Sequence, residues 1–244
     1  MKCLALVRRN LSELIRDPLT LFFGAAFPLV LLGLLTLLQR NIPVNLFAIE
    51  SLAPGVAVFG QAFLTLFSAL LIARDRSTAL TQRLMASPLT GADFILGYAL
   101  PLLPLALLQG LLCLACAAPL GLNLAHLPLT LLVLLVSSVM YIAMGLLFGS
   151  ILNDKQVGGI CGALLTNLSA WLSGVWFDVK LVGGAFYAIA NALPFLHAVE
   201  AARAAAVGNA AALPGHLAVV AAYAAGLLVL AIFAFTRAMR GGKG

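Results

Sequence analysis

Charged side chains are the scarcest class in this sequence of 244 residues. Asp, Glu, Lys and Arg together make up 9% of it, whereas hydrophobic residues make up 63%. Soluble globular domains carry about 25% charged residues. So low a share of charge excludes a soluble domain of ordinary composition and predicts a membrane protein. Apolar runs take up nearly the whole chain, which leaves no room for a soluble catalytic domain.

Acidic side chains are also missing from the middle of the apolar runs. All eight Asp and Glu residues lie near the ends of these runs or outside them. Carriers coupled to protons or ions usually keep an ionisable group within their spans. The pattern therefore argues against secondary transport, although a carrier or channel that works without an ATPase stays an alternative.

The sequence lacks the motifs of common hydrolytic and nucleotide-binding sites. It contains no Gly-x-x-x-x-Gly-Lys-Ser/Thr phosphate loop, no His-Glu-x-x-His zinc motif and no Gly-x-Ser-x-Gly nucleophile motif. A membrane-embedded enzyme would need a polar catalytic cluster, and the sequence offers none. We therefore predict that the chain is not an enzyme and has no catalytic, cofactor-binding or metal-binding residues.

Cysteines are few and lie in or beside apolar runs. They are Cys3, Cys113, Cys116 and Cys161. This distribution implies no disulfide framework. Cys113 and Cys116 form a Cys-x-x-Cys pattern without a second pair, so we interpret them as small packing residues rather than a metal or redox site.

What the sequence does contain is a series of apolar runs of about 20 residues, the length that a helix needs to cross a bilayer core. The six expected spans are residues 19–38, 53–73, 94–118, 129–152, 157–177 and 217–236. Pro101 and Pro104 are expected to kink the third span, because each removes a helix hydrogen bond. The sequence thus predicts an all-α membrane protein with six transmembrane helices in a single domain over residues 1–244.

Residues 2–16 have the pattern of an amphipathic helix lying in the membrane interface. Its apolar face is formed by Leu4, Val7, Leu11, Leu14 and Ile15. The alternative is a simple extension of the first span. The following Asp-Pro pair, residues 17 and 18, is typical of a helix restart.

Residues 178–216 are too polar to cross a membrane and too apolar for a plain loop. We expect two short helices separated at Pro194, which dip into the bilayer and return as an outer re-entrant hairpin. The second helix carries His197, Glu200 and Arg203, of which the last two can pair at i, i+3. Two further full spans here, eight in all, are the alternative.

Residues 74–93 form a polar interruption between the second and third spans. Ser77 or Thr78 can cap a short helix over residues 79–86, and Pro88 ends it. Leu80 and Leu84 would share one face of this helix. A short amphipathic helix between two spans is suited to binding a partner in water, whereas the alternative is a solvated loop.

The basic residues define the expected orientation. One side of the six-span arrangement holds eleven of them: Lys2, Arg8, Arg9, Arg16, Arg74, Arg76, Arg83, Lys155, Arg237, Arg240 and Lys243. The other side holds Arg40, Lys180 and Arg203. This bias predicts that both termini and residues 74–93 are cytoplasmic. It also accounts for most of the net charge of +6, so no nucleic-acid partner is expected.

Among the polar side chains inside the expected spans are Gln61, Thr65, Gln109 and Asn167. They are candidates for lining a transport pathway, but hydrogen bonding between helices is the favoured role. Two patterns, Gly145-x-x-x-Gly149 and Gly158-x-x-x-Gly162, permit close helix contact within one subunit or between two.

Several short motifs occur in a characteristic order along the chain. They are Arg16-Asp17-Pro18, Asp75-Arg76 followed by Gln82-Arg83-Leu84-Met85-Ala86-Ser87-Pro88-Leu89, Gly97-Tyr98, Gly145-x-x-x-Gly149, and Pro194 with Glu200-Ala-Ala-Arg203. In this order and spacing, the chain resembles the permease subunit of the ABC-2 family of ATP-driven exporters over essentially its whole length.

The resemblance implies a coupling helix after the second span that sits in a groove of a separate ATPase subunit. The residues that would make this contact are Arg76, Thr78, Leu80, Gln82, Arg83, Leu84, Met85 and Ser87. A frequent Gly-Thr-x-Glu pattern of the family is replaced by Ala79-Leu80-Thr81-Gln82, which removes a carboxylate from the expected contact.

The resemblance also implies the partners and the location of the chain. Two ATPase subunits would bind ATP and Mg²⁺, and a second copy of the permease or a homologue would complete a dimer in the cell (inner) membrane. The expected substrate is amphiphilic, such as a drug, a natural product or a lipid-like molecule. Export of a lipid-linked glycan is the alternative.

Overall fold

The computed structural model describes residues 2–78 and 90–241, and the side chains of residues 4–78 and 90–238. Within these ranges the chain forms helices and their connections, and no strand is present. The all-α prediction is therefore confirmed. The helix expected over residues 79–86 lies outside the described residues.

The first half of the chain forms a peripheral helix and three long apolar segments. In order, its elements are α1 (Lys2–Arg16), α2 (Pro18–Leu21), η1 (Phe22–Ala26), α3 (Phe27–Arg40), α4 (Ile49–Arg76), α6 (Gly91–Ala99), α7 (Leu102–Ala117) and η2 (Ala118–Leu120). α6 and α7 are separated at Pro101, which interrupts the third expected span as predicted. At Pro104, by contrast, α7 is uninterrupted.

The second half alternates long helices with short ones. In order, its elements are α8 (Leu127–Ile151), α9 (Asp154–Val157), η3 (Gly158–Leu165), α10 (Thr166–Leu172), α11 (Val179–Val182), α12 (Gly184–Ala192), α13 (Pro194–Ala206) and α14 (Leu213–Gly241). α12 and α13 are the two short helices expected before the last span, and they meet at Leu193–Pro194.

Among the described residues, five helical segments are long and apolar enough to cross a membrane. They are Pro18–Arg40, Ile49–Arg76, Gly91–Leu120, Leu127–Ile151 and Leu213–Ala238. Each corresponds to one expected span. The remaining expected span, residues 157–177, coincides with η3 and α10, where the glycine-rich sequence of Gly158, Gly159 and Gly162 takes the wider π-helical form. The count of six spans stays a prediction.

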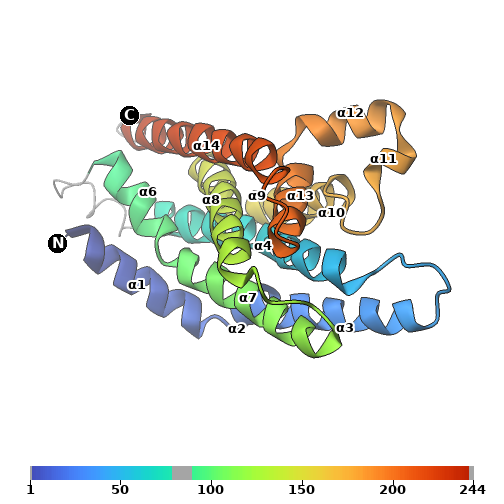
Figure 1. Ribbon diagram of the computed structural model, residues 1–244. Helices are drawn as coiled ribbons and strands as arrows, with labels where there is room; N and C mark the ends of the chain where they lie inside the picture. The colour runs from blue at the N-terminus through green and yellow to red at the C-terminus, as the bar shows by residue number, and fades with distance from the viewer. Residues whose placement is uncertain (1, 79–89, 242–244) are drawn as a thin grey trace.

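Helix α4 is the centre of the molecule. In its most apolar window 89% of the residues are buried, whereas the corresponding share is 17% for Pro18–Arg40 and for Leu213–Ala238. Figure 1 shows α4 passing through the middle, with α14 along one edge and α1 and α3 along the other. The start of α1 and the end of α14 lie at one end of the molecule, and α11 and α12 lie at the opposite end.

Helix α8 packs closely against α4 because its glycines have no side chain. A Cβ atom on Gly145 would lie 2.1 Å from the carbonyl oxygen of Thr65, and one on Gly149 would lie 2.5 Å from that of Ala69. Gly158, by contrast, has no neighbouring atom within 4 Å of such a Cβ. The pattern Gly145-x-x-x-Gly149 is therefore a packing contact between α4 and α8. Gly162, in the other, has the side chain of Leu66 within 3.4 Å of its Cβ position.

Candidate functional site at the junction of helices α1, α4 and α6

The candidate site lies at the two ends of the polar interruption, where α4 ends and α6 begins. α1 reaches this place because the chain turns at Asp17. The Asp17 carboxylate accepts hydrogen bonds from Leu19 N at 3.3 Å and from Thr20 Oγ1 at 2.6 Å, and Pro18 occupies the first turn of α2. α1 is thus a separate helix, as the Asp-Pro pair predicts.

A carboxylate in the centre of the junction joins all three helices. Asp75, near the end of α4, is 4% exposed. Arg9 of α1 donates from both Nη atoms to the two carboxylate oxygens, with Nη2 2.8 Å from Oδ1. Tyr98 of α6 donates its hydroxyl hydrogen to Asp75 Oδ2 at 2.8 Å. A bidentate guanidinium–carboxylate pair fixes orientation as well as distance, so it orients α1 relative to α4.

A second contact holds α1 against α6. Asn10 is fully buried, and its Nδ2 donates to the carbonyl oxygen of Gly97 at 3.1 Å. A Cβ atom on Gly97 would lie 2.5 Å from Leu6 Cδ2, so any larger residue would force the Leu6 side chain of α1 to shift. The Gly97-Tyr98 motif therefore has two roles: Gly97 admits α1, and Tyr98 reaches Asp75.

The charge on Arg9 is maintained by its surroundings. The hydrogen bond from Arg9 to Asp75 raises the pKa of the Arg9 guanidinium, against the opposing effect of partial burial. Glu13, one turn along α1, adds an ion pair at 3.0 Å. Arg9 thus stays positively charged at physiological pH, and removing it would take one of the donors away from the buried Asp75 side chain.

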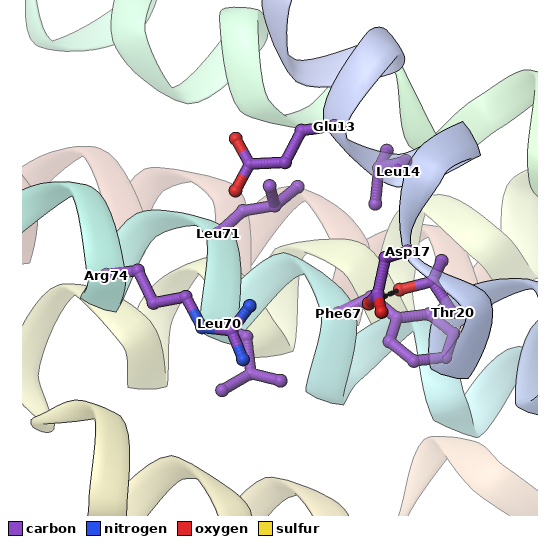
Figure 2. A pocket seen from close by; sticks show the side chains of 8 residues that line it. All are labelled: Glu13, Leu14, Asp17, Thr20, Phe67, Leu70, Leu71 and Arg74. Atoms are coloured by element: carbon purple, nitrogen blue, oxygen red, sulfur yellow. Dashed lines mark hydrogen bonds between the residues drawn. The ribbon is translucent and has the colours of Figure 1, made fainter.

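A small cavity lined by both polar and apolar residues lies beside the junction, between α4 and the turn that joins α1 to α2. Figure 2 shows Glu13 and Asp17 on one side of it and Arg74 on the other. Its volume of about 30 Å³ is enough for a water molecule and too small for an organic substrate. The remaining lining residues are Leu14, Thr20, Phe67, Leu70 and Leu71.

Comparison with protein families shows which family the chain belongs to. Residues 1–207 match the family model of the ABC-2 type transporter. The chain belongs to the ABC-2 type transporter family. It is a multi-pass membrane protein and a transport permease subunit, and ATP hydrolysis belongs to a separate subunit. No curated protein matches the sequence.

In this permease, the residues expected to contact an ATPase are partly described. Arg76 Nη1 donates to the carbonyl oxygens of Gly149 at 2.8 Å and Leu152 at 3.3 Å, so Arg76 caps the end of α8. Thr78 Oγ1 donates to the carbonyl oxygen of Asp75 at 2.8 Å. The other expected contacts lie outside the described residues: Leu80, Gln82, Arg83, Leu84, Met85 and Ser87.

The far end of the polar interruption has a cap that the sequence analysis overlooked. Thr90 Oγ1 accepts from Asp93 N at 3.2 Å, and Asp93 Oδ2 accepts from Thr90 N at 2.8 Å. This capping box starts α6, and its Thr-x-x-Asp pattern is visible in the sequence.

The sequence analysis also overlooked Asn10 of α1, although its spacing from Leu6 and Leu14 places a polar residue on an apolar helix face.

Three of the four candidate pathway residues make hydrogen bonds between helices. Gln61 Nε2 donates to Leu134 O at 2.8 Å, Thr65 Oγ1 to Tyr141 O at 3.0 Å, and Gln109 Nε2 to Ala57 O at 3.2 Å. All three side chains are buried within the chain. Asn167 is exposed and donates to Ala163 O, one turn back in its own helical run. Whether any of the four lines a pathway stays a prediction.

The residues named in the outer hairpin lie on α13 and connect it to its neighbours. Arg203 pairs with Glu200 at 3.0 Å and also donates to Ser51 O at 3.1 Å and Gly174 O at 3.0 Å. His197 Nε2 lies 2.9 Å from Asn191 O, and its Nδ1 lies 2.8 Å from His216 Nδ1. Since a carbonyl only accepts, His197 donates through Nε2 and His216 donates through Nδ1. These contacts tie α13 to α4, α12 and α14.

Proposed function

We propose that this permease serves an ATP-driven exporter that moves an amphiphilic substrate out of the cytoplasm or the inner leaflet. The observation that carries the proposal is the Asp75 junction. It joins α1, the end of α4 and the last turn of α6, and α4 and α6 are the helices that flank residues 79–89. A force applied to that short segment would move the three helices together, because the bidentate pair and the Tyr98 hydrogen bond connect them.

The proposed assembly contains two ATPase subunits and a second copy of this permease or a homologue. ATP and Mg²⁺ are bound by the ATPase subunits, and this chain carries no cofactor. Closure of the ATPases on ATP draws the two coupling segments together and switches the pathway outward. Both termini face the cytoplasm in this arrangement, and the complex resides in the inner membrane.

The class of substrate follows from the scarcity of charge. The described spans offer few ionised contacts, and their outward surface is rich in exposed apolar side chains, including Leu34 and Leu37 of α3. Such surroundings favour a drug, a natural product or a lipid-like molecule over a small ion.

The direction of transport is tested with inside-out vesicles that contain the permease and its ATPase. ATP-dependent accumulation of a fluorescent amphiphilic drug inside these vesicles is the expected result, because the cytoplasmic face is then outside. Accumulation without ATP would instead support a carrier or channel. ATP-dependent depletion from preloaded vesicles would reverse the proposed direction.

The coupling role is tested with the double variant Leu84→Ala, Arg83→Glu. Leu84 lies on the apolar face of the expected helix and Arg83 beside it, so the variant should release the ATPase or uncouple its hydrolysis from transport. Truncating such an interface anchor typically costs more than about 1 kcal/mol. The measurements are co-purification of the ATPase and transport in the same vesicles.

The matched control is Leu38→Ala, Arg40→Glu, which makes the same chemical changes at the end of the first span, on the side of the membrane that is expected to face outward. It should keep both the ATPase and its transport activity. Transport by the Leu84, Arg83 variant at the unmodified rate, with the ATPase still bound, would contradict the coupling role.

A further inference from the structure

A second hollow, unrelated to the Asp75 junction, opens where the C-terminal ends of α4, α8 and α14 meet. Its volume is about 500 Å³, and its walls are mostly apolar. The described lining residues are Arg76, Leu147, Ser150, Ile151, Leu230, Phe233, Ala234, Arg237 and Ala238. Ile151 is 60% exposed and Phe233 is 63% exposed, so the apolar wall is open to whatever surrounds the protein.

The five α14 residues of this hollow form a single stripe at helical spacing that ends in a cation. Leu230, Phe233 and Arg237 succeed one another at i, i+3 and i+7, on the same face of the helix. The apolar part of the stripe therefore lies deeper in the span, and Arg237 lies in the last turns of α14. This order matches an amphiphile with its chains along the span and its headgroup at the helix end.

Two arginines, Arg76 and Arg237, line the hollow, and no carboxylate of the described residues forms an ion pair with either of them. Arg76 uses Nη1 to cap α8, and no hydrogen bond of its Nε or Nη2 is found among the described residues. Arg237 is exposed at the rim. A cation against an apolar wall is costly without a counter-charge, and guanidinium groups bind phosphate through several donors.

We propose that this hollow binds an anionic phospholipid of the cytoplasmic leaflet, with its phosphate between Arg76 and Arg237 and an acyl chain along Ile151, Leu230 and Phe233. The helix ends concerned belong to the side that carries most of the basic residues, and that leaflet holds the anionic lipids. Basic pockets between helices on this side are suited to such headgroups. The proposal concerns a resident lipid and does not depend on which substrate is exported.

The test measures lipid binding to the purified permease in detergent, without the ATPase, by native mass spectrometry. Phosphatidylglycerol is compared with phosphatidylcholine of the same acyl chains. We expect saturable binding of phosphatidylglycerol that is at least about tenfold tighter than binding of phosphatidylcholine. Arg237→Gln should weaken phosphatidylglycerol binding by about fivefold to tenfold, as loss of a charge-assisted contact requires.

Two further variants separate the proposed site from general surface charge. Phe233→Ala should weaken binding of phosphatidylglycerol by about threefold or more, because it shortens the apolar wall. Lys155→Gln removes a positive charge from the neighbouring helix α9 outside the hollow, and it should change the affinity by less than about twofold. Arg237, Phe233 and Lys155 are all exposed, so none of these changes removes core packing.

Several results would overturn the proposal. Equal effects of Arg237→Gln and Lys155→Gln would indicate a diffuse electrostatic surface. Equal affinity for the two lipids would show that the anionic headgroup is not recognised. Full competition by glycerol phosphate, or no effect of Phe233→Ala, would show that the site recognises a free phosphate without its chains.

Discussion

Asp75 and Asp154 illustrate how the same type of ion pair has different consequences in different surroundings. The Asp75 side chain is 6% exposed, and a guanidinium and a phenol donate to it. Asp154 is 51% exposed and lies 3.5 Å from Arg74, which is itself 53% exposed. Water screens the second pair, so only breaking the first is expected to lower the stability strongly.

The first prediction follows from this difference. Asp75→Asn removes the charge that receives Arg9, and it should lower the free energy of unfolding by about 1.5–3 kcal/mol, the usual range for hydrogen bonds to charged groups. Denaturant unfolding of the purified permease in detergent measures the change. In vesicles with the ATPase, the same variant should hydrolyse ATP with reduced transport, because the connection from the end of α4 to α1 and α6 is weakened.

Arg74→Gln is the matched control, since it breaks an ion pair only one residue away along the chain. It should cost less than about 1 kcal/mol. Equal losses for the two variants would contradict a special role for the buried junction.

At the scale of elements, the packing of α8 on α4 depends on two positions without side chains. The atoms nearest to a Cβ at Gly145 are Ser68 Oγ at 2.0 Å and the backbone oxygen of Thr65 at 2.1 Å. The backbone cannot rotate away as a flexible side chain can, so the helices themselves would have to separate. The hydrogen bonds of Thr65 and Ser68 to α8 depend on the same short distance.

The second prediction concerns Gly145→Ala. This change should lower the free energy of unfolding by more than about 2 kcal/mol, because over-packing forces the helices apart and weakens the Thr65 and Ser68 hydrogen bonds. Thermal unfolding in detergent provides the measurement.

Gly226→Ala provides the control within α14, where no atom lies within 4 Å of the new methyl group. There the better helix propensity of alanine should leave the stability unchanged or slightly raised. A harmless Gly145→Ala would mean that α8 and α4 are not in close contact.

At the scale of the whole molecule, the topology depends on residues 157–177. Five helical segments meet the length and hydropathy of a span, and an odd number of crossings would place the two termini on opposite sides. The apolar runs predict six crossings, and the basic residues then predict a cytoplasmic side for both termini. In Figure 1 the start of α1 and the end of α14 lie at the same end of the molecule, which agrees with an even number.

The third prediction is that a reporter fused after Gly244 faces the cytoplasm, whereas a reporter fused after Arg40 faces the opposite side. Alkaline phosphatase and green fluorescent protein fusions distinguish the two sides. Reporters on the same side would refute the six-span arrangement.

The fourth prediction places the outer hairpin. Single cysteines at Lys180 and Asn209, in a background without native cysteines, should both react with a membrane-impermeant thiol reagent added from outside. Both positions are exposed, so labelling depends on the side of the membrane rather than on burial. Labelling from opposite sides would indicate that the segment between them crosses the membrane.

The sequence alone determined the all-α architecture, the approximate positions of five spans, the restart at Asp17 and the pair of short helices around Pro194. These features depend on residues close together in the chain: the length of an apolar run, the proline ring and the capping side chain. The amphipathic pattern of α1 was also visible in the sequence, but the sequence did not show which face of α1 packs against the rest of the protein. Leu4 and Ile15 are exposed, whereas Leu6, Asn10 and Leu14 are buried against the protein.

The tertiary structure alone decided which distant residues meet. Arg9 and Asp75 are 66 positions apart, and nothing in the sequence selects Arg9 over the neighbouring Arg8 as the partner of that carboxylate. Two glycine patterns look alike in the sequence, yet a Cβ at Gly145 would collide with the α4 backbone, whereas one at Gly158 would meet open space. Local spacing fixes where a helix begins and which residues share a face, but the neighbour of each face depends on how all the helices pack together.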